Sequence, residues 1–110
     1  MNVNYIIEKL NLELITGRPD DLNEIKGVFI GDLLSLVMSR AKQGDLWITI
    51  QTHINVVAVT DLLEIGAVLV AENMEIEKDT IRKADDLGII ILKSNQSAYQ
   101  LACQIHDLGL

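Results

Sequence analysis

The chain has 110 residues, which is enough for one domain with its own core and too few for two. Its formal net charge of −7 argues against nucleic acid and anionic membranes as partners, because both repel an acidic surface. Hydrophobic residues make up 49% of the chain and aromatic residues only 4%, so we expect an aliphatic core with few rings for stacking bases.

The number of cysteines and the N-terminal sequence indicate in which cellular compartment the protein is expected. Cys103 is the only cysteine, so no internal disulfide can form, as is typical of proteins of the reducing cytoplasm. The first residues, MNVNYIIEKL, lack the basic region and apolar core of a signal peptide. No apolar run reaches the roughly 18 residues that a membrane span needs. We therefore expect a soluble cytoplasmic protein.

The first third of the chain predicts three short segments. Apolar residues at helical spacing predict a helix over residues 3–10. A strand is expected at residues 12–15, where the pattern leaves open whether it runs antiparallel at an edge of the sheet. Residues 16–26 hold the only proline and predict a loop.

The rest of the chain repeats one unit, a short apolar strand followed by a helix. Four such units with short connections predict an α/β fold: a three-layer α/β/α sandwich whose sheet is mostly parallel and has four or five strands. We expect strands at 27–30, 46–50, 67–71 and 89–92, each followed by a helix, at 32–44, 55–65, 77–88 and 96–108.

Polar residues follow each of these strands, and the carboxyl ends of parallel strands are where open α/β sheets bind ligands. The turn after the second of them is the densest, because it places four polar side chains in five positions where one helix cap is enough. Glu72, Asn73 and Lys93 also lie at strand ends. The candidate ligand-binding residues are Asp32, Gln51, Thr52, His53, Asn55, Ser94 and Asn95.

A simpler interpretation competes at each position, since turns between strands and helices are polar in any case. Asp32 is well placed to cap the helix that follows it, and Gly44 and Gly66 are expected to end the helices before them. Ser94 and Asn95 are expected to cap the last helix. His53 is the one candidate for acid–base chemistry, yet no acid or nucleophile stands beside it in sequence.

Catalytic and cofactor motifs are missing from the sequence. There is no Gly-x-Ser-x-Gly, no phosphate-binding Gly-Lys-Ser/Thr loop and no dinucleotide glycine triplet. Cys103 and His106 share a predicted helix face with Tyr99, but two ligands do not make a metal site, so we read Cys103 as a small buried thiol. We expect no catalytic residue, no cofactor and no metal.

Two predicted helices, 32–44 and 55–65, are apolar over more of their circumference than one sheet contact requires. A self-complementary homodimer would cover the excess. Burial between neighbouring helices of one monomer is the alternative.

The blocks GDLL, WITIQTH and SAY lie within residues 27–110, a region that resembles the stand-alone DRTGG-domain proteins of bacteria and archaea. The resemblance implies that residues 1–110 form a single DRTGG-like α/β domain, similar in fold to the N-terminal domain of HPr kinase/phosphorylase. Related copies are accessory modules in some CBS-domain pyrophosphatases and phosphotransacetylases. At the motif that names the family, Lys26, Gly27 and Val28 stand where Thr-Gly-Gly would precede the strand, so only Gly27 matches.

The resemblance implies a regulatory or ligand-binding module, often dimeric and without assigned catalysis. The leading hypothesis is a non-catalytic sensor that dimerises and binds a small, nucleotide-like ligand at the strand ends. One alternative is a small enzyme that uses His53 as acid or base. Another is a structural subunit of a larger enzyme complex that binds no ligand.

Overall fold

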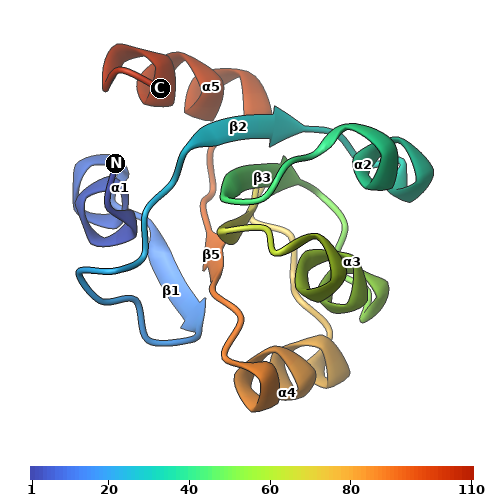
Figure 1. The fold of residues 1–110 in the computed structure, drawn as a ribbon. Coiled ribbons are helices and arrows are strands. Elements are labelled where there is room, and N and C mark those ends of the chain that lie inside the picture. The colour runs from blue at the N-terminus through green and yellow to red at the C-terminus, as the bar shows by residue number, and fades with distance from the viewer.

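A computed structural model describes all residues, 1–110, as a five-stranded sheet between two layers of helices. Helices α1 and α5 cover one face of the sheet, and α2, α3 and α4 cover the other (Figure 1). The predicted three-layer sandwich is confirmed. The elements are α1 (Val3–Leu10), β1 (Glu13–Thr16), β2 (Gly27–Ile30), α2 (Leu34–Arg40), β3 (Asp45–Thr49), α3 (Asn55–Leu63), β4 (Ala67–Val70), α4 (Lys78–Leu87), β5 (Ile91–Lys93) and α5 (Ala98–Asp107).

The strand order is β1-β5-β4-β3-β2. Strands β2 to β5 are mutually parallel, as the strand-then-helix pattern predicts. Strand β1 occupies the edge beside β5 and runs antiparallel to it, which answers the question that the sequence left open. The ladder is irregular between Leu14 and Thr16, where the Thr16 hydroxyl donates to Ile89 O and accepts from Ile91 N.

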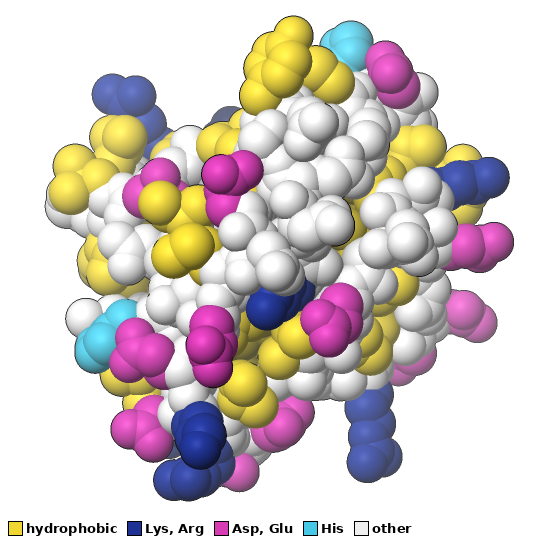
Figure 2. All heavy atoms as spheres, turned by 180° about the vertical axis from the view of Figure 1, so that it is seen from behind, with side chains coloured by type: hydrophobic (Ala, Val, Ile, Leu, Met, Phe, Trp, Pro, Cys, Tyr) yellow, Lys and Arg dark blue, Asp and Glu magenta, His cyan; other side chains and the backbone are white.

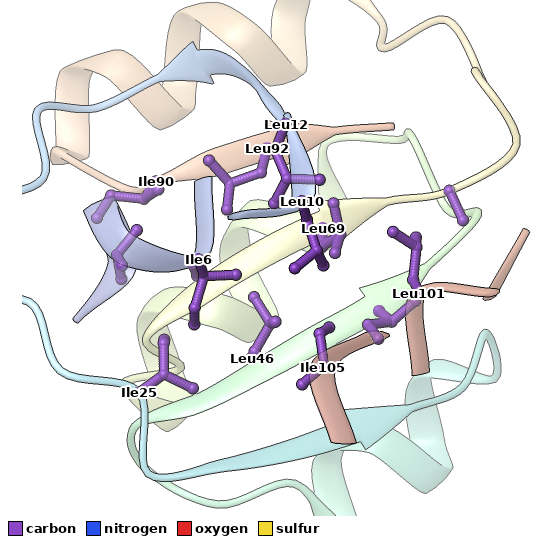
Figure 3. Packing of buried hydrophobic residues seen from close by; sticks show 14 residues of the cluster. Ile6, Leu10, Leu12, Ile25, Leu46, Leu69, Ile90, Leu92, Leu101 and Ile105 are labelled. Atoms are coloured by element: carbon purple, nitrogen blue, oxygen red, sulfur yellow. The ribbon is translucent and has the colours of Figure 1, made fainter. Parts of the chain in front are cut away.

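The two sheet faces carry separate cores. On the α1 and α5 side, Ile6 and Leu10 from α1 meet Leu101 and Ile105 from α5 over the aliphatic side chains of the strands (Figure 3). On the other side, Val37, Val56, Val57 and Ala84 of α2, α3 and α4 pack on β3, β4 and β5. Strands β3 and β4 are buried along their whole length, because helices cover both of their faces.

Helix α2 is shorter than predicted at both ends. It begins at Leu34 and ends at Arg40, so Asp32 does not cap it and Gly44 does not end it. The carboxylate of Asp32 is bonded elsewhere, as described below. Gly44 still has a positive φ of 82°, but it shapes the turn into β3 rather than a helix end.

Three other local predictions are wrong. Glu64, with φ 54°, ends α3 two residues before Gly66. Ser97 caps α5 in a reciprocal pair with Gln100, so Ser94 and Asn95 are not its caps. Cys103 is exposed rather than buried, since it lies on the solvent side of α5.

No helix has both the length and the apolar character that crossing a membrane requires. Acidic side chains are scattered among hydrophobic ones over the face seen from behind (Figure 2).

Candidate functional site

The four parallel strands end at one edge of the sheet, and all of the candidate residues follow these ends. The structure divides them into three groups. One is a bonded network after β2 and β3, the second is the turn that enters α3, and the third lines a pocket after β4 and β5.

Asp32 and Gln51 belong to the bonded network. Asp32 Oδ1 accepts the Thr49 hydroxyl at 2.8 Å and the Ile50 amide at 2.9 Å. Gln51 Nε2 donates to the Asp32 carbonyl at 2.8 Å, and the Gln51 amide donates to the Thr49 hydroxyl oxygen. The network ties the end of β2 to the end of β3, so these polar groups already have partners within the protein.

Thr52, His53 and Asn55 form the entry to α3. The Thr52 carbonyl accepts the hydroxyl of Thr80 on α4 at 2.8 Å. His53 Nδ1 accepts the amide of Asn55 at 3.2 Å, which satisfies an amide in the first turn of α3. His53 is exposed, and its side chain has no other bonded partner, so no side chain orients it for acid–base chemistry.

Ser94 and Asn95 lie where neighbouring connections leave the sheet in opposite directions. The segment after β4 leads to α4, whose Ala84 belongs to one core. The segment after β5 leads to α5, whose Leu101 belongs to the other (Figure 1). A crevice between connections that diverge to opposite faces is the usual ligand site of an open α/β sheet.

A pocket of about 230 Å³ occupies this position. None of its lining residues is hydrophobic. Most of the lining side chains make no hydrogen bond within the protein; the Ser94 hydroxyl, which accepts the Gln96 amide at 3.1 Å, is the exception. The pocket, called here the polar pocket, is lined by Asn11, Glu13, Asn73, Lys93, Ser94 and Asn95.

The backbone beside the polar pocket has an unusual conformation. Glu72 and Asn73 are consecutive residues with φ of 63° and 53°, a backbone region that residues other than glycine rarely adopt. Two backbone bonds hold them there, from the Glu72 amide to Gln96 O at 2.9 Å and from the Asn73 amide to Ser94 O at 2.8 Å. The segments after β4 and β5 therefore form one bonded rim.

Asn11 and Glu13 were missed as site residues. Asn11 precedes β1 and Glu13 begins it. They reach this edge because β1 is antiparallel, which brings Glu13 opposite Lys93. The sequence holds one usable signal. If residues 12–15 were assigned to the antiparallel edge position, their amino end would fall beside the carboxyl ends of the other strands.

The polar pocket offers amides, a hydroxyl, one carboxylate and one ammonium group, which together suit a neutral or zwitterionic polar ligand. No three His, Cys, Asp or Glu residues lie close enough together to hold a metal ion. The side chains at this edge of the sheet can therefore bind a ligand through hydrogen bonds.

The comparisons with known proteins identify one family and one solved structure of similar fold. The family model described as "DRTGG domain" matches residues 5–108. Among solved structures, this chain resembles the CBS and DRTGG domains of the regulatory region of Clostridium perfringens pyrophosphatase, complexed with its activator diadenosine tetraphosphate. The TM-score is 0.73 at 15% identity, over 94% of this chain and 45% of that one. No curated protein matches the sequence. Since the family model covers nearly the whole chain, the protein belongs to the DRTGG domain family.

Proposed function

We propose that this protein is a non-catalytic regulatory module that senses a small polar or nucleotide-like ligand. Its structural neighbour is part of the regulatory region of an enzyme, in a complex with a nucleotide activator. Membership of the DRTGG family supports a regulatory role. The lack of an orienting partner for His53 weighs against the alternative of a small enzyme.

The observation that carries the ligand proposal is the polar pocket between the connections that follow β4 and β5. It lies at the one place where the fold predicts a ligand crevice, and polar side chains without partners line it. Glu72 and Asn73 add a strained backbone at its rim, a feature that tends to cluster at ligand sites.

The size of the polar pocket limits what it can enclose. At about 230 Å³ it is smaller than the roughly 300–1,000 Å³ of pockets that surround drug-sized ligands. It fits a ribose or another sugar ring better than a whole nucleotide. A nucleotide-like ligand would place its sugar here and leave the rest at the surface.

Thermal unfolding with ATP, diadenosine tetraphosphate and UDP-glucose, each at millimolar concentration, tests the ligand proposal. A ligand that binds only the folded state raises the unfolding temperature. We expect Asn95→Ala to abolish this increase, because its exposed amide lines the pocket without a partner in the protein. If no compound stabilises the wild-type protein, the ligand proposal is wrong.

Asn55→Ala is the matched control, since Asn55 is an exposed asparagine at the same edge that lies outside the polar pocket. It should leave the increase in unfolding temperature unchanged. The opposite pattern, loss with Asn55→Ala and retention with Asn95→Ala, would place the ligand at the start of α3.

We further propose that the protein dimerises through the apolar surface around α3. Two shallow apolar grooves flank this helix, one against α2 and one against α4. Leu62, which lines both grooves, is 68% exposed in the monomer, and Met38 of α2 is 48% exposed. This surface, called here the α3 face, comprises Leu34, Met38, Ile54, Ala58, Leu62 and Leu87.

A second copy of the chain is the partner that fits the α3 face best. A two-fold axis presents the same surface twice, so one apolar patch covers the other. Asp61 and Lys83 line the same groove with opposite charges, and a two-fold arrangement can set Asp61 of one copy against Lys83 of the other. Packing within one monomer buries Val56 and Val57 but leaves Leu62 exposed. It therefore accounts for only some of the apolar residues on α3.

A further inference from the structure

A second pocket lies away from the polar pocket, and three of its lining side chains are cations. It has a volume of about 410 Å³ and borders the amino end of β2. Arg40 ends α2 and Lys42 follows it in the turn before β3, whereas Lys26 precedes β2, so two chain segments bring three cations together. The lining residues of this pocket, called here the basic pocket, are Lys26, Gly27, Val28, Phe29, Arg40, Lys42, Gln43 and Asp45.

Positive charge is concentrated in the basic pocket. The chain has nine Lys and Arg residues against sixteen Asp and Glu, yet three of the nine line this one pocket. None of the three forms an ion pair, and none of their head groups donates a hydrogen bond to the protein. These three are free to bind an anion.

The one carboxylate in the basic pocket is already bonded. Asp45 is buried, and its Oδ2 accepts the amide of Lys42 at 2.8 Å. Its Oδ1 sits so close to Gly27 that a Cβ there would lie 2.8 Å from it. The carboxylate therefore faces the backbone of the pocket wall and fixes the turn that carries Lys42.

The side-chain directions along β2 determine where the basic pocket lies. Val28 packs toward the core under α1 and α5, whereas Phe29 packs toward the core under α2, α3 and α4. A pocket that both residues line must lie along the free edge of β2, which pairs only with β3. Lys26 donates its amide to Gly44 O on the β3 side, so by strand alternation the amide of Gly27 faces outward.

We propose that the basic pocket binds a small phosphate-bearing anion, such as pyrophosphate or the phosphates of a nucleotide. An arginine fork, two ammonium groups and outward-facing strand amides are the donors that phosphate oxygens take in proteins. The volume lies within the roughly 300–1,000 Å³ of small-ligand sites. The half-buried ring of Phe29 offers an apolar wall beside the charges. This site is separate from the polar pocket and does not depend on it.

Isothermal titration calorimetry with pyrophosphate and with ATP at low ionic strength tests the proposal. We expect the double variant Arg40→Gln, Lys42→Gln to weaken binding by about tenfold or more, because it removes charge-assisted hydrogen bonds. The control, Lys78→Gln with Arg82→Gln, changes the net charge equally on the exposed surface of α4 and should alter binding by less than about twofold.

A residue-specific measurement accompanies the titration. In ¹H–¹⁵N spectra, pyrophosphate should shift the amide resonance of Gly27 more than that of Asn95, which lies at the other edge. Asn95→Ala should leave pyrophosphate binding intact, so a failure of the polar pocket and a failure of the basic pocket give different results.

Three results would overturn the proposal. One is no binding of either phosphate compound by the wild-type protein. The second is an equal loss in both double variants, which would indicate diffuse attraction by surface charge. The third is tighter binding of a polyglutamate peptide than of pyrophosphate, which would assign the free edge of β2 to an extended acidic segment.

Discussion

At the residue scale, Thr49 and Thr60 are equally buried, each 2% exposed, and differ in what their hydroxyls contact. Thr49 donates to Asp32 and accepts the amide of Gln51. The Thr60 hydroxyl is the one buried polar side-chain group without a hydrogen-bond partner. A buried polar group without a partner reduces stability, whereas a bonded one contributes to it.

The two threonines predict opposite effects of the same isosteric substitution, threonine to valine, on stability. Thr60→Val should raise the free energy of unfolding by about 1 kcal/mol, because it removes an unsatisfied hydroxyl from the interior. Thr49→Val should lower it by about 1–2 kcal/mol, because it breaks the link between the ends of β2 and β3. Urea denaturation measures both. A destabilising Thr60→Val would show that this hydroxyl has a partner, such as a bound water.

Asp32 is a residue whose hydrogen-bond partners could not be predicted from its type and its neighbours in sequence. As the residue before an apolar helical run, it has every feature of an N-cap. Its carboxylate binds Thr49 and Ile50 instead, and both lie 17 or more residues away. Local preference cannot report a partner that only the pairing of β2 with β3 brings close.

At the element scale, three helices end in the same left-handed conformation with different residues, α1 with Asn11, φ 52°. Glu64 ends α3 with φ 54°, and Gly88 ends α4 with φ 70°. Glycine adopts this conformation freely, whereas a residue with a Cβ is strained in it. A carboxylate at a helix C-terminus is also disfavoured by the helix dipole.

We therefore expect Glu64→Gly to raise the free energy of unfolding by about 0.5–1 kcal/mol. Gly88→Ala should lower it by about 1 kcal/mol. A Cβ at Gly88 meets no atom within 4 Å, so this control isolates backbone strain from steric contact. Urea denaturation of the single variants and of the double variant checks both values. Equal effects of the same sign would contradict the argument.

The elements themselves were predictable because the signal for each one is local. Helical periodicity and short apolar runs between turn residues located all five helices and five strands, and their ends were off by a few residues. The alternation of strands and helices also implied the parallel arrangement of β2 to β5. The direction of β1 was not predictable, because a four-residue edge strand carries no mark of its partner. The polar pocket was found only in part for the same reason, since Asn11 and Glu13 depend on that direction.

At the scale of the whole molecule, the α3 face should determine the oligomeric state. Leu62→Glu places a carboxylate at the centre of this face and should convert a dimer into a monomer. Leu22→Glu is the matched control, because Leu22 is 87% exposed in the loop before β2, outside the α3 face. Sedimentation velocity at micromolar concentration distinguishes the two species. A wild-type monomer, or a dimer that survives Leu62→Glu, would rule out this interface.

The proposed dimer interface and the two pockets use different parts of the molecule. The polar pocket lies at the carboxyl ends of β4 and β5, the basic pocket lies along the free edge of β2, and the α3 face covers one outer layer. A change at one of the three should leave the other two intact, since none shares a lining residue with another. Variants at the three surfaces can therefore be combined and compared directly.

Trp47 lies in the interior of β3, fully buried, and its indole N–H donates to the carbonyl of Gly31 at 2.8 Å. It is the only tryptophan in the chain, so excitation at wavelengths that tyrosine does not absorb reports on this residue alone. Its emission should be blue-shifted in the native state and move to longer wavelength on unfolding, with no second tryptophan to confuse the signal. Because its bonding partner belongs to the end of β2, the emission also reports on separation of β2 from β3. The fold thus provides an optical probe of its own edge strand without any label.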